Sequence, residues 1–451
     1  MKGKALSKRE SWSGRTSFIF AAAASAVGLG NFWRFPYLTA RFGGGTFLLT
    51  FVVLVFTVGV ALLILEIALG RKTKMSCIEA FAYFGKKYRI LGIICSFTPF
   101  VISSYYCVVG GWVIKYLWAY IWESPQVIGQ AEYFNTFTSN PIESLIFVLI
   151  FLITAVVVVG LGVKKGIERA NNTLMPALII LSVFLAVWTA FQPGAIDGII
   201  YFLTPDFSKF DFDLLVAAIS QTFFALSLGI SIMITYGSYL DKKTPIIRST
   251  RIISSIGVIV SILAGFCIVP AAFMAFGSGE AVANNAGPGL MFVTLPGVFL
   301  KLRFLAKPMG ILFFLLVLFA ALTSIISTFE ACVSILMDSL KLPRKVSVAI
   351  FVPVFILLSV FVNLGYNVLS FIEPLGPGTA ILDLADFINS AVLLPLVGII
   401  LCIFVGWIIK PKAIIDEVLL SDKFTIRKVW VFVIKFVAPI FLILMMLSNF
   451  W

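Results

Sequence analysis

The feature that most constrains the fold is a succession of long apolar stretches along the whole chain. About eleven of them can cross a bilayer, since a crossing helix needs roughly 20 apolar residues. Of the 451 residues, 61% are apolar and only 12% are charged, whereas a soluble domain is about half apolar and a quarter charged. No alternating strand pattern suggests an outer-membrane barrel. The sequence therefore predicts an all-α polytopic membrane protein.

Lysine and arginine residues indicate how the crossings are oriented. They are concentrated in the N-terminal tail and in every second loop after it, while the intervening loops are mainly acidic. The loop before the eighth stretch breaks this pattern with Lys301, Arg303 and Lys307. Loops that stay in the cytoplasm carry an excess of Lys and Arg. The pattern predicts a multi-pass protein of the cell membrane with a cytoplasmic N-terminus and, for an odd number of crossings, an extracellular or periplasmic C-terminus. The net charge of +13 thus marks topology and requires no nucleic-acid partner.

Residues that would carry enzyme chemistry are sparse. The chain has no histidine, which excludes histidine-based proton relays and metal sites. Its six cysteines are not spaced as a metal site or a disulfide framework. No cluster of acids and no nucleophile motif accompanies them. The sequence predicts that this protein is not an enzyme.

Two of the apolar stretches are interrupted by glycine near their middle. The first reads Ala-Val-Gly-Leu-Gly-Asn at 26–31, and the sixth reads Ser-Leu-Gly-Ile-Ser at 227–231. Such residues free backbone N–H and C=O groups where bulk water cannot satisfy them. Helix N-termini attract anions and unwound carbonyls coordinate cations, so each interruption is a candidate ligand site. Close helix packing through small residues is the alternative interpretation.

The two interruptions lie five crossings apart, so the two halves of the chain have opposite orientations in the membrane. Interrupted helices in matching positions of two inverted halves indicate the central site of a secondary transporter. The predicted organisation is a single transmembrane domain, 1–451, with inverted repeats over about 16–192 and 213–408. One extra helix follows at about 429–449.

Motifs at these interruptions are shared with a known family. The segments Asn31–Pro36 and Gln221–Gly229 resemble the first and sixth helices of the neurotransmitter:sodium symporter family. Further motifs match in order and approximate spacing: Tyr105-Tyr106, Lys165–Arg169, Thr235–Tyr239 and Leu322–Ser324. The resemblance implies the LeuT fold, with five plus five inverted helices of which the first and sixth are broken. The eleven crossings and short tails resemble the family's bacterial amino-acid transporter branch.

By this resemblance, an amino-acid substrate would bind between the two interruptions. Two backbone N–H groups and one phenol would hold its carboxylate: Leu29, Gly30 and Tyr106. Carbonyls and one hydroxyl would meet its ammonium group: Ala26, Phe224, Ala225 and Ser227. Gly28 stands where monoamine-carrying members have an Asp, which indicates a zwitterionic substrate that brings its own carboxylate.

The pocket for the substrate's side chain is carried over position by position and is mainly apolar. It comprises Ser25, Ile102, Phe224, Ile230, Ser324 and Thr328. This uncharged lining predicts a neutral, hydrophobic or aromatic L-amino acid. One methylene changes binding by only about 1–3 kcal/mol, so leucine, methionine and the aromatic amino acids remain unresolved.

The resemblance implies sodium sites of unequal completeness. Two hydroxyls and three carbonyls match the family's second sodium site: Thr323, Ser324, Ala24, Val27 and Ala320. Hydrogen bonding of the Thr-Ser pair to carbonyls of its own helix is the alternative interpretation. The first site keeps Ala26 and Asn31. However, Ala225 replaces a family Thr or Ser. The position of the expected Asn or Asp falls near Gly257, with Ser254 and Ser255 one turn or less away. The prediction is a complete site at the family's second sodium position and an altered or absent site at its first position.

The need for chloride is left open. Gln221 and Ser261 resemble chloride ligands of the animal members, whereas Phe51 stands where a Tyr hydroxyl is expected. A helix-packing role for Ser261 is the alternative.

Charges inside apolar stretches predict gates, because an unpaired charge is costly in a bilayer. Arg34 and Asp386 match the family's outer pair, with Phe224 and Tyr106 forming a lid over the substrate. An inner gate is predicted from one matching pair and two supporting aromatic residues: Arg9, Asp338, Trp12 and Tyr239. Glu66, in the second stretch, resembles a buried carboxylate that supports the broken first helix.

Together these features predict a sodium-coupled symporter that imports a neutral amino acid by alternating access. A proton-coupled carrier of the same fold is an alternative, and it would be expected to replace Thr323 and Ser324 with a basic group. A non-transporting amino-acid sensor is another, and it would be expected to lose the inner gate or to gain a large soluble domain.

Overall fold

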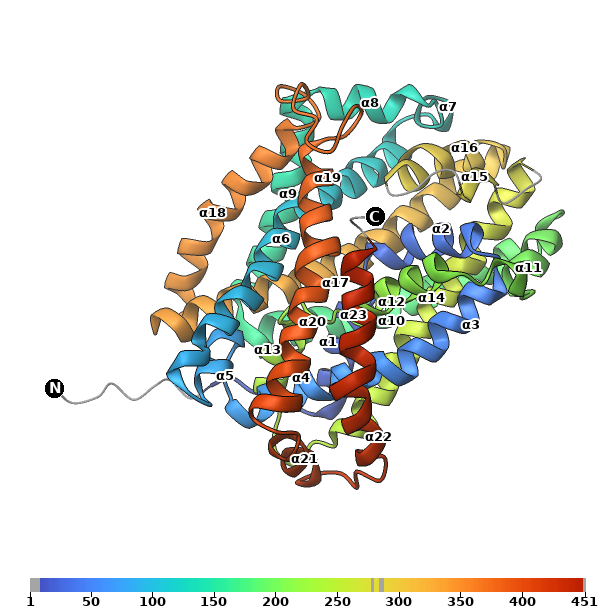
Figure 1. The fold of residues 1–451 in the computed structure, drawn as a ribbon. Helices are drawn as coiled ribbons and strands as arrows, with labels where there is room; N and C mark the ends of the chain where they lie inside the picture. The colour runs from blue at the N-terminus through green and yellow to red at the C-terminus, as the bar shows by residue number, and fades with distance from the viewer. Residues whose placement is uncertain (1–8, 277–279, 284–287, 449–451) are drawn as a thin grey trace.

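The computed structural model describes residues 9–276, 280–283 and 288–448 (Figure 1). Throughout these ranges the chain is helical, and its β structure consists of two isolated bridges. Short helices cover the two ends of the helical bundle (Figure 1). Helices α7 (Pro125–Ile128) and α8 (Glu132–Ser139) lie at the upper end, and α21 (Lys412–Leu419) lies at the lower end.

Nine segments of the described residues are long and apolar enough to cross a membrane unbroken. Their helices are α3 (Gly45–Leu54), α4 (Val60–Thr73), α6 (Arg89–Trp122), α9 (Pro141–Gly160), α10 (Arg169–Ala190), α14 (Ile246–Phe276), α17 (Ala306–Leu340), α18 (Arg344–Leu364), α19 (Ile381–Phe387), α20 (Leu394–Ile403), α22 (Arg427–Phe432) and α23 (Ala438–Leu447). Where two helices share a segment, a π-helical turn joins them, as Val55–Gly59 joins α3 to α4.

Both predicted interruptions are present as breaks in the helices. The first separates α1 (Arg15–Ala26) from a short turn and α2 (Arg34–Arg41), and the two arms are bent by 60°. The second separates α12 (Phe212–Ala225) from α13 (Ile232–Ser238). With 14 residues, α12 is too short to cross a bilayer alone. The nine unbroken segments and the bent first pair give ten spans among the described residues, and the eleventh predicted crossing requires α12 and α13 to span the membrane together.

Left-handed backbone breaks the sixth crossing. Ser227, Gly229 and Ser231 have φ of +50°, +72° and +63°, a region that costs a residue other than glycine about 1–2 kcal/mol. Hydrogen bonds from both serines offset this cost. The Ser227 hydroxyl donates to the Ser25 carbonyl at 2.7 Å, and the Ser231 hydroxyl donates to the Cys95 carbonyl at 3.2 Å. The break is therefore anchored to the first and third crossings.

Glu66 supports this sixth crossing, and its predicted support of the first crossing stays a prediction. Its carboxylate Oε1 accepts the Gly229 N–H at 2.8 Å. The two residues meet because α4 packs along α13. Close packing is possible because Gly70 and Gly237 lack side chains: a Cβ at either would overlap the backbone of the opposite helix. Glu66 thus satisfies a backbone amide that the break leaves without a helical partner.

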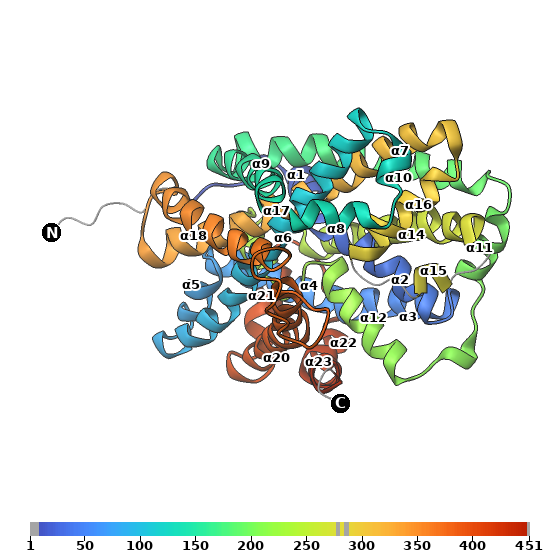
Figure 2. The same ribbon diagram turned by 90° about the horizontal axis from the view of Figure 1, so that it is seen from above.

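The bundle has an inner and an outer set of helices. Seen from above, α6 and α17 lie in the interior, while α9 and α18 lie further out (Figure 2). Two thirds of the most apolar part of α6 and of α17 is buried, against one third for α9 and α18. The outer helices therefore present their apolar side chains to lipid, and the broken first crossing packs against the inner α17.

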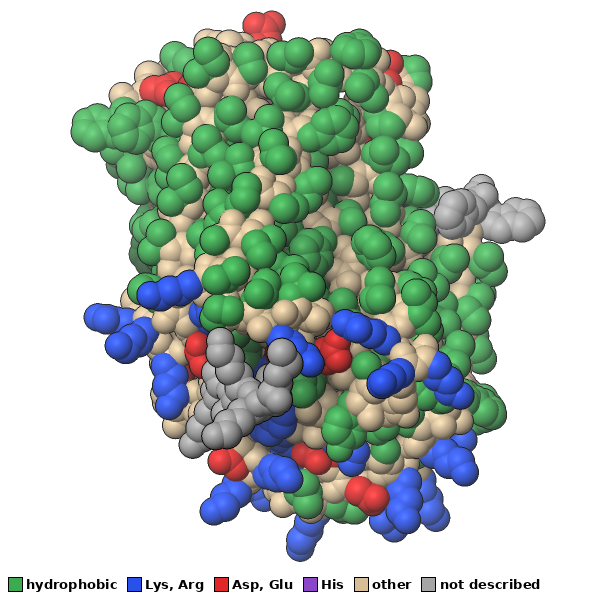
Figure 3. All heavy atoms as spheres, turned by 90° about the vertical axis from the view of Figure 1, so that its left-hand side faces the viewer, with side chains coloured by type: hydrophobic (Ala, Val, Ile, Leu, Met, Phe, Trp, Pro, Cys, Tyr) green, Lys and Arg blue, Asp and Glu red, His purple; other side chains and the backbone are tan. Residues whose placement is uncertain are grey.

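The surface separates apolar from charged regions in the way a membrane protein requires. In Figure 3 a broad apolar surface covers the upper part of the molecule, and Lys and Arg gather at its lower end. This basic end is the one where α21 lies. On this face, Lys and Arg thus gather at one end of the bundle, as the topology prediction expects. The repeat boundaries, 16–192 and 213–408, stay predictions.

Candidate functional site

A cavity of about 530 Å³ lies where the two broken crossings face α6 and α17. It contains ten of the residues predicted to bind substrate: Ser25, Leu29, Gly30, Ile102, Tyr106, Phe224, Ser227, Ile230, Ser324 and Thr328. The other two, Ala26 and Ala225, are buried beside it and were predicted to contribute only carbonyls. The cavity also reaches Pro288 and Leu375, which lie outside the crossings on the side away from the basic end.

One part of the cavity has the groups that bind an anion. The N–H of Leu29 donates to the Tyr106 hydroxyl at 3.1 Å, so the amide and the phenol lie side by side. Gly28 borders the same space: a Cβ there would lie 2.8 Å from Ser324 Oγ and 3.1 Å from the Tyr106 hydroxyl. An anion held here meets a helix-end amide and a hydroxyl without a full buried positive charge.

Hydroxyl groups bind the carbonyls exposed by the break in the first crossing. Ser324 Oγ lies 3.2 Å from the Ser25 carbonyl oxygen and 3.3 Å from that of Val27. Thr323 Oγ1 lies 3.1 Å from the Ala320 carbonyl oxygen within α17. Ala24 is buried on α1. Among the predicted ligands, the structure thus joins Ser324 to the Val27 carbonyl, whereas Thr323 also bonds the Phe319 carbonyl of its own helix at 3.0 Å. Uncharged oxygens of this kind suit a hard cation.

The predicted first sodium site has fewer side-chain oxygens. A Cβ on Gly257 would lie 3.0 Å from the Ala225 carbonyl oxygen, so the two substituted positions face each other. Neither residue has a side-chain oxygen. Asn31 lines the cavity, and its buried Nδ2 has no partner among the described residues. The candidate ligands are therefore backbone carbonyls, Asn31 and Ser254, which lies one turn before Gly257 and whose buried hydroxyl has no partner among the described residues.

The residues that resemble a chloride site make separate contacts, and the need for chloride stays open. The Ser261 hydroxyl donates to the Gly257 carbonyl of its own helix at 2.9 Å. Phe51 packs against Phe35, with ring centroids 5.2 Å apart. Gln221 is buried, and neither of its amide atoms has a partner among the described residues. Ser261 thus has the helix-bound geometry that the packing interpretation describes.

The predicted outer pair is not joined in this structure. Arg34 donates to the Ser220 hydroxyl at 2.7 Å, and its guanidinium lies 4.5 Å from the centre of the Phe224 ring. Asp386 accepts from the hydroxyls of Tyr105, at 2.9 Å, and Ser390, at 3.0 Å. No ion pair within 4.0 Å links Arg34 to Asp386 in the described part of the chain, and both line the cavity.

The predicted inner pair is joined at the basic end of the bundle. Arg9 Nη1 lies 2.8 and 2.7 Å from the two carboxylate oxygens of Asp338. The Arg9 guanidinium also lies 5.0 Å from the centre of the Tyr239 ring. Trp12 donates its indole N–H to the Tyr236 carbonyl at 3.1 Å. The N-terminal segment therefore closes this end of the molecule by bridging α13 and α17.

A sequence comparison places this architecture among known transporters. The model of the sodium:neurotransmitter symporter family matches residues 9–126 and 140–451. The chain belongs to this family. The prediction made from the motifs at the two breaks is thereby confirmed, and the family is one of transporters.

The symporter is similar to other sodium-dependent transporters over nearly its whole length. It is 34% identical to one from Haemophilus influenzae, over 98% of each chain, and 34% identical to YhdH of Bacillus subtilis, over 97% of each. A crystal structure of MhsT in complex with L-phenylalanine matches with a TM-score of 0.86 and 36% identity, over 98% of this chain and 100% of MhsT. These matches confirm the LeuT fold.

Sequence reasoning missed a second charged cluster near the inner gate of the symporter. Arg344 Nη1 and Nη2 lie 2.6 and 2.8 Å from the carboxylate oxygens of Glu330, and Arg344 Nε lies 3.2 Å from Glu10. Glu330 also accepts from the Tyr239 hydroxyl. The available signal was Glu330 itself, an acid inside the eighth apolar stretch, which requires a partner.

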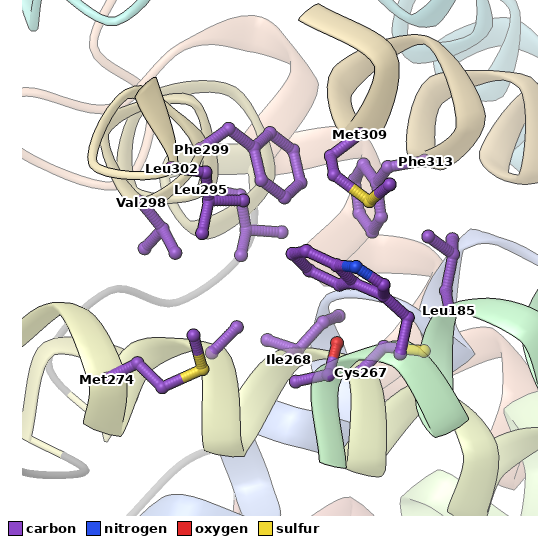
Figure 4. Close-up of a pocket in the computed structure, with 13 residues that line it drawn as sticks. Leu185, Cys267, Ile268, Met274, Leu295, Val298, Phe299, Leu302, Met309 and Phe313 are labelled. Atoms are coloured by element: carbon purple, nitrogen blue, oxygen red, sulfur yellow. The ribbon is translucent and has the colours of Figure 1, made fainter. Parts of the chain in front are cut away.

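A second hollow in the symporter is too small and too apolar to bind an amino acid. It measures about 30 Å³ and lies between α10, α14, α17 and α16 (Leu295–Leu300). Figure 4 shows Phe299, Met309, Phe313 and Met274 around it. No charged side chain lines it. Its volume is near that of one water molecule, so it is a packing gap.

Proposed function

We propose that this symporter couples the entry of Na⁺ to the import of a neutral, hydrophobic or aromatic L-amino acid by alternating access. The single observation that carries the proposal is the position of Ser324. Its hydroxyl contacts the Val27 carbonyl of the predicted sodium site and also borders Gly28 in the cavity. One residue thus belongs to the cation site and the substrate site.

The cavity suits both charged ends of an amino acid. The carboxylate of the substrate would lie at the Leu29 N–H and the Tyr106 hydroxyl. The Leu29 nitrogen and the Tyr106 hydroxyl oxygen are 3.1 Å apart. The ammonium group of the substrate would reach the carbonyls at the two breaks and the Ser227 hydroxyl. Gly28 leaves that space open, since a side chain there would collide with Ser324 and Tyr106. The carboxylate of the substrate therefore provides the anion that this part of the site lacks.

The residues predicted to surround the substrate's side chain are uncharged. Ile102, Ile230 and the Phe224 ring supply apolar surface, and Thr328 donates its hydroxyl to the Ser324 carbonyl at 2.9 Å. A charged substrate side chain would be buried without a partner there, at a cost of several kcal/mol. The nearby charges, Arg34 and Asp386, lie in the outer part of the cavity and make their own contacts.

Binding of a panel of radiolabelled amino acids to the purified symporter tests the substrate class. In the presence of Na⁺ we expect phenylalanine, tryptophan, leucine or methionine to bind at least about tenfold more tightly than aspartate, glutamate, lysine or arginine, because the latter bury an extra charge. Glycine serves as the control for the carboxylate and ammonium contacts alone. Tightest binding of an acidic or basic amino acid would exclude the proposed class.

Sodium would couple to the substrate through the broken first crossing. A cation between α1 and α17 would fix the carbonyls of Val27 and Ala24, and the Leu29 amide follows two residues after Val27. Binding of either ligand then favours the same backbone geometry, and such coupling is reciprocal. Substrate should therefore increase the affinity for Na⁺ by the factor by which Na⁺ increases the affinity for substrate.

The gates have the arrangement of an outward-facing transporter. Arg9 and Asp338 are paired at the basic end, while Arg34 and Asp386 are apart at the other end. If the basic end lies in the cytoplasm, as the positive-inside rule predicts, the cavity opens outward and is closed inward. Import then requires the outer pair to join over the substrate and the inner pair to separate.

The stoichiometry follows from the two substituted positions of the first sodium site. Ala225 and Gly257 supply no side-chain oxygen, so we expect one Na⁺ to drive each transport event. Uptake measured against Na⁺ concentration should give a Hill coefficient near one. A coefficient clearly above one would show a second coupled sodium ion, with water or the substrate carboxylate in place of the missing oxygens.

A further inference from the structure

A lysine lies well inside the last crossing. Lys435 belongs to the π-helical turn Val433–Val437 between α22 and α23. At 1.5 Å per residue it lies about 12 Å along the helix from Arg427, where this crossing begins. A cation at that depth is costly unless its side chain reaches a partner or the membrane surface. The position of Lys435 therefore needs an explanation beyond topology.

The neighbouring crossing is shaped to receive this side chain. Gly406 lies in the π-helical turn Phe404–Ile408 that follows α20. A Cβ on Gly406 would lie 3.3 Å from the Cγ of Lys435. Because glycine has no side chain, the aliphatic part of Lys435 can pack closely against the backbone at this position. The Lys435 ammonium lies 4.7 Å from the centre of the Trp407 ring. In the described part of the chain, no carboxylate pairs with Lys435 within 4.0 Å.

The surroundings of Lys435 are apolar and face outward. Trp407, Phe432 and Phe436 are 54%, 58% and 43% exposed, although they are large aromatic residues on crossing segments. Phe436 lies between the other two, with ring centroids 5.7 Å from each. Such a surface meets lipid chains. The molecules that lie against this surface are therefore lipids.

The direction of the helix brings the ammonium toward the lipid headgroups. Helical side chains lean toward the N-terminus of their helix, and the last crossing begins at the basic end of the bundle. A lysine stem in this orientation carries its ammonium toward the interface. Trp407 lies near the end of the tenth crossing, at the depth where tryptophans are enriched in membrane proteins.

We propose that Lys435, Trp407 and the notch at Gly406 form a binding site for an anionic phospholipid. The Lys435 ammonium would pair with the phosphate of the headgroup, and the acyl chains would lie along Phe432 and Phe436. The site is at the basic end of the symporter. Its assignment to the cytoplasmic leaflet rests on the proposed orientation, whereas the binding itself does not.

Native mass spectrometry of the full-length protein in detergent tests this proposal. Phosphatidylglycerol and phosphatidylcholine are titrated separately onto the unsubstituted protein and onto Lys435→Met, which keeps the apolar stem. We expect the substitution to weaken phosphatidylglycerol binding about fivefold, the effect of one basic residue at a membrane surface, and to leave phosphatidylcholine binding unchanged. Lys435→Arg should retain the preference.

The matched control is Lys423→Met, which removes an exposed lysine from the loop before the last crossing. If both Met variants lose phosphatidylglycerol binding equally, the attraction is a general effect of charge and the site is excluded. Unchanged binding by Lys435→Met also overturns the proposal. Competition by millimolar inorganic phosphate would show an ion site instead of a lipid site. Because neither substrate nor a gradient is used, the result is independent of the transport proposal.

Discussion

Replacing Thr323 and Ser324 together with alanine should abolish sodium-dependent amino-acid binding. The double substitution removes both side-chain oxygens of the predicted second sodium site. Ser324 Oγ also contacts the carbonyls of Ser25 and Val27 at the break in the first crossing. A hydrogen bond to a charged group contributes about 1.5–3 kcal/mol. If each lost oxygen contributes a similar amount, we expect Na⁺ affinity to fall by at least about 100-fold.

The measurement is binding of labelled substrate over a range of Na⁺ concentrations. A matched control is Ser182→Ala, since the Ser182 hydroxyl donates to the Leu178 carbonyl of its own helix at 2.8 Å and lies outside the cavity. Thermal unfolding in detergent separates loss of binding from loss of folding. A folded double variant that still binds substrate in a sodium-dependent way would contradict the assignment of Thr323 and Ser324.

The substitution Gly28→Ala should reduce substrate affinity by about 10- to 100-fold. Its Cβ would lie 2.8 Å from Ser324 Oγ and 3.1 Å from the Tyr106 hydroxyl. Ser324 cannot move freely, because its hydroxyl already contacts two carbonyls of the first crossing. Overpacking of this kind costs about 1–3 kcal/mol, and here it displaces groups that belong to both ligand sites.

Equilibrium binding of the same amino acid to Gly28→Ala and to Gly160→Ala gives a direct comparison. A Cβ on Gly160, in α9, would have no heavy atom within 4 Å, so this variant reports the general effect of replacing glycine with alanine in a crossing helix. Affinity within twofold of the unsubstituted protein for both variants would place the substrate elsewhere in the cavity.

The architecture could be predicted because its determinants are local in sequence. Gly28 and Gly30 interrupt one apolar stretch and Gly229 interrupts another. A freed backbone group in a bilayer needs a partner, so these positions predicted a ligand site. The order and spacing of the family motifs then predicted that Tyr106 and Ser324 share one cavity. In the structure both residues line it.

The contacts between distant charges could not be predicted in the same way. Arg344 and Glu330 pair across the ends of two crossings, and Arg71 is wholly buried against Glu417 at 2.7 Å. Each pair depends on how the ends of helices meet in space, which neither periodicity nor composition encodes. Glu66 shows the same limit: its burial was predictable, but its partner depended on which broken crossing packs beside α4.

The separation of the outer pair, Arg34 and Asp386, could not be predicted for a different reason. Arg34 and Asp386 were predicted as partners from the family pattern, which describes the gate without specifying its conformation. In this structure Arg34 donates to Ser220 and Asp386 accepts from Tyr105. A transporter that alternates between two conformations has contacts that exist in only one of them. A single sequence pattern therefore could not predict which pair is formed here.

Uptake into proteoliposomes under imposed ion gradients tests the central claim most directly. The purified symporter is reconstituted, and uptake of a labelled hydrophobic amino acid is followed with an inward Na⁺ gradient, with an inward proton gradient in the absence of Na⁺, and with neither. We predict concentrative uptake with the Na⁺ gradient alone. Uptake that follows the proton gradient and ignores Na⁺ would contradict sodium coupling, and substrate binding without uptake under any gradient would indicate a sensor.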